Sequence, residues 1–268
     1  MAGLRFSVAG AAMLMFCRAS GRQTRVTVQQ FWRLAVIGIL LLAIANAALG
    51  WAELYVPTGL AALLVSITPI WFLTIEHLLL RRGAPDRVGR RALVGVALGI
   101  VGMVVLLWPR LRDTHVLGAW QLLAALGLLS SSFCWAFGSV LAHRWHLAVD
   151  PFVGAGWQMA IAGSVDVCIA LALGEQRVAR WDAAGLGAIL YLVVFGSWVG
   201  YSAYIWLLRH IPTAKVSTYA YVNPVVAVIL GWIVLGEPVD RFMIGGAAII
   251  IPAVALVTTA EHDIDPAD

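Results

Sequence analysis

Apolar segments follow one another almost without interruption from Ala2 to Ala260, and this pattern constrains the fold more than any other feature. Hydrophobic residues make up 62% of the 268-residue chain and charged residues only 12%, whereas charged residues are about a quarter of a soluble domain. A chain with so few charges cannot cover its surface with groups that suit water. A helix needs about 20 apolar residues to cross a bilayer, and most of the segments approach that length. The sequence therefore predicts a polytopic, all-α membrane protein.

Nine segments are expected to form transmembrane helices. Their apolar residues are continuous rather than alternating, so a β-barrel with a polar lining is not expected. The segments are residues 2–17, 34–54, 57–80, 92–108, 117–142, 151–173, 183–208, 211–235 and 242–260.

The basic residues between these segments predict the orientation in the membrane, because cytoplasmic loops are enriched in Lys and Arg. When the loops are assigned alternately to the two sides, 12 of the 18 basic residues fall on one side, which we expect to face the cytoplasm. The acidic residues 261–268 fall on the same side and are expected to form a solvated tail. This distribution favours membrane topology and does not suggest nucleic-acid binding. The larger set is Arg18, Arg22, Arg25, Arg33, Arg81, Arg82, Arg87, Arg90, Arg91, Arg144, Arg209 and Lys215.

The second half of the sequence repeats features of the first half at a nearly constant offset. Corresponding loops of the two copies differ in charge character, as expected for copies inserted in opposite orientations. We therefore predict an inverted repeat of five-helix bundles, with residues 1–110 as the first repeat and 111–260 as the second. Trp51, Pro57, Thr58 and Pro69 recur 155 residues later as Trp206, Pro212, Thr213 and Pro224; Gly3, Ala9 and Gly10 recur 153 later as Gly156, Ala162 and Gly163; Arg91 and Gly95 recur 150 later as Arg241 and Gly245.

The first repeat holds four of the predicted helices and the second holds five, because segment 117–142 has no counterpart in the first half. A symmetric architecture therefore predicts one further helix ahead of Met1.

Pro69 and Pro224 lie midway along their predicted segments. A proline cannot donate to the carbonyl four residues earlier, so the carbonyls of Val65 and Ala220 are expected to be free. Two broken helices at equivalent depths are typical of transporter sites, and we interpret the two prolines as hinges. Simple packing kinks are the alternative interpretation.

Polar and aromatic side chains near these prolines are candidates for substrate binding. The alternative for each of them is an interhelical hydrogen bond or an interfacial aromatic position. The candidates are Asn46, Thr68, Trp71, Trp135, Gln158, Tyr201, Tyr219 and Asn223.

Asp166 lies near the middle of segment 151–173. A carboxyl group within the membrane is costly and marks a functional site by default. Asp166 is therefore a candidate for proton coupling, and a protonated or paired structural aspartate is the alternative.

The sequence contains no GxxxxGK[ST], HExxH or GxSxG pattern. Its three cysteines are odd in number and include no CxxC. We therefore expect no cofactor, no metal site, no catalytic residue and no enzyme activity.

Three stretches resemble the EamA-type permeases of the drug/metabolite transporter (DMT) superfamily. They are LRF at 4–6, VPTGLAALLVSITPIW at 56–71 and AYVNPVVAVILGWIVLGEPV at 220–239, and the resemblance covers nearly the whole chain. It implies an inner-membrane permease of ten helices, in two inverted five-helix repeats around a central cavity. On this resemblance, we expect the chain to begin at the family's second helix.

Together these features predict a secondary transporter that exports small organic metabolites, such as amino acids or related solutes, by alternating access. A lipid-facing permease or flippase, a non-transporting assembly subunit and an intramembrane enzyme are the alternatives. The expected partners are a small-molecule substrate and the lipid bilayer, and a homodimer is left open.

Overall fold

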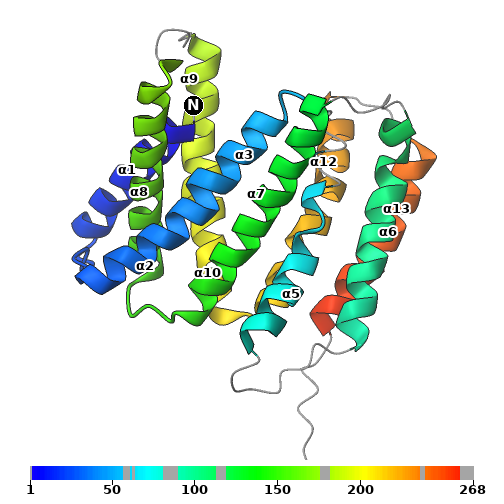
Figure 1. The fold of residues 1–268 in the computed structure, drawn as a ribbon, viewed down its shortest axis with the longest axis horizontal. Coiled ribbons are helices and arrows are strands. Elements are labelled where there is room, and N and C mark those ends of the chain that lie inside the picture. The colour runs from blue at the N-terminus through cyan, green and yellow to red at the C-terminus, as the bar shows by residue number, and fades with distance from the viewer. Residues whose placement is uncertain are drawn as a thin grey trace, which may run out of the picture. The chain divides into compact units, whose positions relative to one another are not determined.

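The computed structural model describes residues 2–56, 61, 64–80, 90–112, 119–175, 182–235 and 239–259. This part of the chain is helical almost throughout and contains no strand (Figure 1). The predicted all-α class is therefore confirmed. Five of the described helices are long and apolar enough to cross a membrane, whereas the predicted total of nine stays a prediction. The five are Ala2–Ala19, Val28–Ala52, Ala119–Arg144, Pro151–Ala172 and Gly185–His210.

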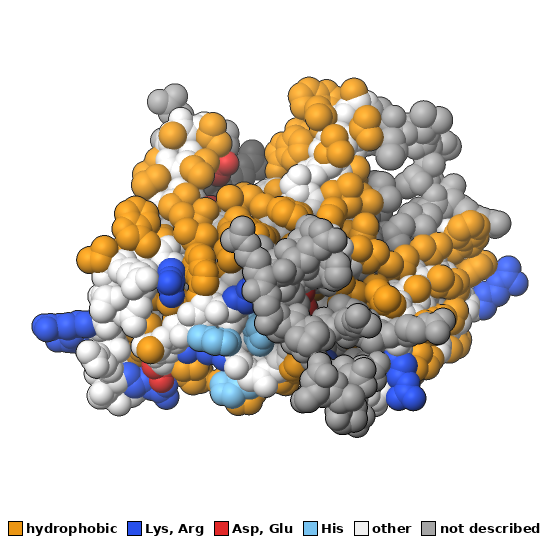
Figure 2. Space-filling view, turned by 60° about the horizontal axis from the view of Figure 1, so that its bottom comes forward, with side chains coloured by type: hydrophobic (Ala, Val, Ile, Leu, Met, Phe, Trp, Pro, Cys, Tyr) orange, Lys and Arg blue, Asp and Glu red, His pale blue; other side chains and the backbone are white. Residues whose placement is uncertain are grey.

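Large apolar side chains are exposed on these helices, as lipid contact requires. Trp120, Leu190 and Ile251, for example, are each 64% exposed. Hydrophobic side chains also make up much of the surface that Figure 2 shows for the described residues.

The chain forms two compact units, each built from two separate stretches of sequence. Unit 1 consists of Met1–Ala47 and Gly138–Pro212, and unit 2 of Ala48–Phe137 and Thr213–Asp268. Each unit thus combines helices from both halves of the sequence. The boundaries after residues 47 and 137 fall inside α3 (Ala45–Ala52) and α7 (Ala119–Arg144).

In unit 1, the most extensive contact joins α1 (Ala2–Ala19) to α8 (Pro151–Ala172), which lie side by side in Figure 1. A Cβ atom added to Gly10 would lie 2.3 Å from the amide nitrogen of Ala160, and one added to Gly163 would lie 2.2 Å from that of Ser7. Residue numbers rise along one helix as they fall along the other, so the helices are antiparallel. Small residues allow this close backbone approach within a membrane. The other helices of unit 1 are α2 (Val28–Gly38), η1 (Ile39–Ile44), α9 (Ala183–Tyr191), η3 (Leu192–Tyr201) and α10 (Ser202–His210).

Unit 2 is built in the same way around α6 (Arg90–Arg112) and α13 (Arg241–Thr259). A Cβ atom added to Gly246 would lie 2.6 Å from the Leu106 nitrogen, and one added to Gly95 would lie 2.9 Å from the Ala253 oxygen. These two helices are therefore also antiparallel and closely packed. Unit 2 also contains α5 (Thr68–Leu80), α11 (Thr213–Val216), α12 (Tyr219–Leu235) and residues 119–137 of α7.

Helix α2 begins at Val28, six residues before the start of the predicted segment 34–54. The Thr27 hydroxyl accepts a hydrogen bond from the Gln30 amide, while the Gln30 side chain accepts one from the Thr27 amide. This capping box satisfies two backbone donors at the helix start. The helix was predicted to start too late because the prediction used the first apolar residues of the segment and not the capping residues before them.

Two long helices of unit 1 each contain a π-helical segment, η1 (Ile39–Ile44) and η3 (Leu192–Tyr201). Shifting residues 39–44 by the 155-residue offset of the repeat gives 194–199, which lies within η3. π-Helical turns are rare and often occur at functional sites. Their recurrence at equivalent positions therefore directs attention to this part of unit 1.

The two segments that contain the predicted hinges are interrupted near their prolines. Turns at residues 66–67 and 217–218 precede α5 and α12, so Pro69 is the second residue of α5 and Pro224 the sixth of α12. The expectation of a free Val65 carbonyl is wrong, because this oxygen accepts a hydrogen bond of 2.5 Å from the Thr68 hydroxyl. The repeat residues Pro57 and Thr58 and the acidic tail 261–268 lie outside the described residues.

Candidate functional site

Polar side chains of unit 1 gather around η3. The Tyr201 hydroxyl donates a hydrogen bond of 2.7 Å to Gln158 Oε1. The exposed fractions of the two residues are only 5% and 2%. An unpaired polar group at such a depth would cost about 1–3 kcal/mol, and the pair avoids this cost. The structure thus brings together two of the predicted substrate-binding residues, one from α8 and one from the end of η3.

A second polar contact reaches η3 from α1. Arg5 Nε donates a hydrogen bond of 3.0 Å to the Ser197 hydroxyl oxygen, and Ser197 is fully buried. The Arg5 guanidinium also lies 4.8 Å from the centre of the Phe6 ring. Arg5 is the fourth residue of the candidate span Ala2–Ala19, and charged residues within such spans are rare and usually functional.

Arg5 and Gln158 occupy equivalent positions of the repeat, 153 residues apart. Their partners on η3, Ser197 and Tyr201, are four residues apart and so lie on the same side of a helix. The π-helical segment therefore receives one polar side chain from each half of the sequence.

Two further polar contacts of unit 1 lie close to its π-helical segments. The Asn46 side chain in α3 donates to the Leu41 carbonyl at 3.0 Å, within η1. The hydroxyls of Ser139 and Tyr204 are 2.6 Å apart. Asn46 thus supports the altered helix in the structure, and its role in substrate binding stays a prediction.

Asp166 lies on α8, where its Cβ is 3.0 Å from the position that a Cβ on Gly3 would take. The residue is half-buried, and its Oδ2 atom is buried with no hydrogen-bond partner among the described residues. The local geometry therefore allows the predicted role in proton coupling without testing it.

The other candidates for substrate binding lie in unit 2. The Trp71 indole nitrogen donates to the Ser132 hydroxyl oxygen at 3.2 Å, and its ring meets Phe133 edge-on at 5.4 Å. Thr68 is buried and bonded to its own helix start. Trp135 is half-buried on α7, Tyr219 begins α12, and Asn223 is exposed on α12. Their role in substrate binding stays a prediction.

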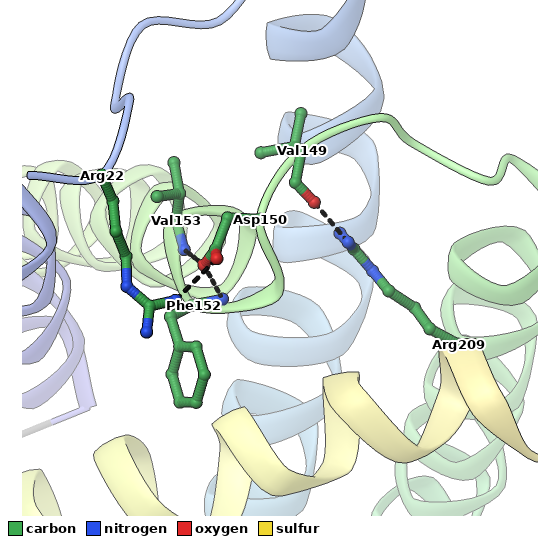
Figure 3. A network of polar contacts seen from close by, with 6 residues as sticks. All are labelled: Arg22, Val149, Asp150, Phe152, Val153 and Arg209. Carbon is green, nitrogen blue, oxygen red and sulfur yellow. Dashed lines mark hydrogen bonds and ion pairs between the residues drawn. The ribbon is translucent and has the colours of Figure 1, made fainter.

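Outside this polar group, a network fixes the chain segment that enters α8 (Figure 3). Asp150 Oδ1 accepts hydrogen bonds from the amides of Phe152 and Val153, while its Oδ2 pairs with Arg22 at 2.6 Å. Arg209, at the end of α10, donates to the Val149 carbonyl. Figure 3 shows the two arginines reaching this segment from two sides, so it is held to both α10 and the chain after α1.

Three features of unit 1 were not predicted: the two π-helical segments, the bond between Arg5 and Ser197, and the network at Asp150. The available signal for Arg5 was its equivalence to Gln158 in the repeat. Within the described residues, no group of three or more His, Cys, Asp or Glu side chains is arranged to hold a metal ion.

The family model described as the EamA-like transporter family matches residues 1–108 and 122–259. The chain belongs to the EamA-like transporter family. This result confirms the resemblance to EamA-type permeases of the DMT superfamily that the three sequence stretches indicated.

Similar proteins carry transporter names. The uncharacterized inner membrane transporter YedA of Escherichia coli K12 is 35% identical over 263 residues, which cover 98% of this chain and 82% of YedA. An uncharacterized transporter of Archaeoglobus fulgidus is 21% identical over 257 residues, covering 96% of this chain and 87% of that protein. This EamA-family protein is therefore a multi-pass transporter of the inner membrane.

A solved structure with the description "Crystal structure of protein" shares the fold. Its TM-score is 0.80 at 18% sequence identity, and the match covers 96% of this chain and 85% of the other.

Proposed function

We propose that this EamA-family transporter is a secondary transporter that exports small organic metabolites, such as amino acids or related solutes, by alternating access. Two inverted repeats, 1–110 and 111–260, would move against each other about a substrate site near the membrane midplane.

The observation that carries the proposal is the packing of helices that correspond to each other in the repeat. Gly3 and Gly10 of α1 correspond in the repeat to Gly156 and Gly163 of α8. The two helices are antiparallel. Helices α6 and α13 correspond through Gly95/Gly245 and are antiparallel as well. Two copies inserted in opposite orientations would place equivalent helices in this way.

The contacts between α1 and α8 have the same symmetry. Gly10 lies against Ala160, and Gly163 lies against Ser7. In the repeat, with its offset of 153 residues, Gly163 is the equivalent of Gly10 and Ser7 is the equivalent of Ala160. The second contact is therefore the symmetry equivalent of the first. The family model, which matches the two halves separately, supports the same division of the chain.

The polar groups near η3 support a solute with polar parts. Gln158, Tyr201, Arg5 and Ser197 lie in mainly apolar helices. Ligand sites are commonly lined by a few precisely placed polar groups among apolar side chains. Asp166, with its unpartnered carboxyl oxygen, would couple export to proton entry.

The breaks that precede α5 and α12 support a hinge role for Pro69 and Pro224. Turns at residues 66–67 and 217–218 leave each helix discontinuous a few residues before its proline. Short non-helical stretches absorb the backbone rotation of a rocking movement.

Flux measurements in proteoliposomes test this function. We expect saturable movement of at least one solute from a panel of amino acids and other small organic acids, amines and amides, and faster movement under a pH gradient. Replacing Pro69 or Pro224 by Ala should slow the flux. Replacing Pro252, a proline inside α13, by Ala should not. A panel without any protein-dependent flux would refute the proposal. Faster redistribution of labelled lipid, without solute flux, would favour a flippase.

A further inference from the structure

Arg5 is a cation inside a candidate membrane span, Ala2–Ala19. A guanidinium carries five N–H donors and is charged at any physiological pH. Residues of this kind within a membrane usually pair with an acidic group or mark the path of a charged ligand.

Few of these donors are used within the described part of the chain. Nε donates to the Ser197 hydroxyl oxygen, and the guanidinium faces the Phe6 ring. The ion pair found among the described residues joins Arg22 to Asp150, so Arg5 has no acidic partner there. The buried Oδ2 atom of Asp166, on the adjacent α8, has no hydrogen-bond partner and so does not bond to Arg5 either.

The Arg5 guanidinium packs against η3 at a glycine, Gly196. A Cβ atom on Gly196 would lie 2.7 Å from Arg5 Nη2, which is too close for two atoms that are not bonded. The absence of a side chain at residue 196 therefore lets Nη2 approach the η3 backbone. Ser197, the next residue, is fully buried and accepts the Nε hydrogen bond.

The equivalent position in the other half of the chain is different. Gln158 is neutral and its Oε1 atom is satisfied by the Tyr201 hydroxyl. Of the two equivalent side chains that reach η3, Arg5 thus has charge and donors left over, whereas Gln158 is paired. Because Arg5 keeps unused donors and Gln158 does not, Arg5 is the one of the two suited to bind a ligand.

We propose that Arg5 and Ser197 bind a carboxylate group of the transported solute. The two Nη groups would donate in parallel to the two carboxylate oxygens, a geometry that guanidinium favours. The Ser197 hydroxyl accepts from Nε and has its own hydrogen free to donate to the same carboxylate. This inference rests on the proposed transport function and narrows its substrates to organic acids, amino acids among them.

The test compares acids with their amides, which have nearly the same shape but lack the anionic group. The probes are L-phenylalanine with L-phenylalaninamide and L-lactate with L-lactamide. The full chain is purified in detergent, and binding is measured as the concentration-dependent rise in its unfolding temperature. The same probes are then used for flux in proteoliposomes. Because binding is measured without flux, failure of the transport function and failure of the Arg5 assignment give different results.

We expect the wild-type protein to bind at least one acid about tenfold or more tightly than its amide, which corresponds to about 1.4 kcal/mol. Arg5→Gln, which installs the residue of the equivalent position, should abolish this preference, and Arg5→Lys should retain part of it. Arg241→Gln is the matched control, because Arg241 is exposed and stacks on Phe242 at 5.1 Å, much as Arg5 stacks on Phe6. The control should keep the wild-type preference.

Several results would overturn the assignment. They are equal binding of acids and amides by the wild type, no binding of either acid, or an unchanged preference in a folded Arg5→Gln protein. Loss of acid binding on adding phosphatidylglycerol, with no loss on adding phosphatidylcholine, would instead identify a lipid phosphate as the group bound at Arg5. Acid-selective binding without flux would retain the Arg5 site and refute transport.

Discussion

Gly10 of α1 lies so close to Ala160 of α8 that a Cβ atom on the glycine would come within 2.3 Å of the alanine amide nitrogen. The backbone of α8, rather than a movable side chain, occupies that space. The first prediction follows from this contact. Gly10→Ala should destabilise the protein by about 1–3 kcal/mol, the usual cost of inserting a methyl group into a packed interface.

The measurement is the unfolding free energy or temperature in detergent micelles. Gly187→Ala is the matched control, because Gly187 is also helical and has open space where its Cβ would lie. That change should be neutral or slightly stabilising, since alanine favours a helix more than glycine does. Equal effects of the two substitutions would contradict the close packing of α1 on α8.

The second prediction concerns the buried pair of Tyr201 and Gln158. Tyr201→Phe removes the hydroxyl that donates to Gln158 Oε1 at 2.7 Å and leaves a buried acceptor unpaired. We expect a loss of about 1–3 kcal/mol of stability. Adding Gln158→Met, which replaces the amide by an apolar group of similar length, should recover much of this loss. If the double substitution is as unstable as the sum of the single ones, the hydrogen bond is not what holds the pair.

Much of this fold follows from composition and length alone, because a lipid environment leaves few alternatives to the apolar helix. Helices α1 and α8 were predicted to within about two residues at each end for this reason. The start of α2 was missed because the capping box of Thr27 and Gln30 outweighs the polar residues of its first turn. The π-helical segments could not be predicted, since a wider helical turn has no characteristic composition.

The site was predictable only in part, for a similar reason. Sequence position located Gln158 and Tyr201 in the apolar interior, but did not indicate that they pair with each other. Pro69 has no N–H to donate to the Val65 carbonyl, but the hydroxyl of Thr68 donates to it instead. Arg5 was not among the predicted site residues, because only the packing of α1 against η3 shows that its side chain points to Ser197. Side-chain direction depends on neighbours that the sequence does not reveal.

The third prediction tests the orientation of the two repeats. Arg22, just after α1, pairs with Asp150, just before α8, so both lie at the same end of these antiparallel helices. The charge distribution predicts that this end faces the cytoplasm. In a variant with Cys17, Cys134 and Cys168 replaced by Ala, a cysteine at Gln23 or Ala148 should react with an impermeant maleimide only after the membrane is opened. A cysteine at Glu175, beyond the far end of α8, should react in intact cells. The same pattern for all three cysteines would refute the inverted arrangement.

The fourth prediction concerns Asp166, whose Oδ2 atom is buried on α8 without a hydrogen-bond partner among the described residues. If this carboxyl group takes up and releases a proton during each cycle, Asp166→Asn fixes the neutral form and removes the coupling. Flux driven by a pH gradient should then fall to the rate seen without a gradient, while exchange of labelled for unlabelled solute continues. Both rates are measured in the same proteoliposomes.

Asp182→Asn is the control for this change, since asparagine also serves as the cap that Asp182 provides for the Gly185 amide at the start of α9. Its gradient-driven flux should match that of the wild type. Continued acceleration of Asp166→Asn by the gradient would exclude Asp166 as the coupling group. A folded Asp166→Asn protein that has lost exchange as well would show that the carboxyl group is needed for solute movement itself, because a group used only for protons is not required when no net proton transfer occurs.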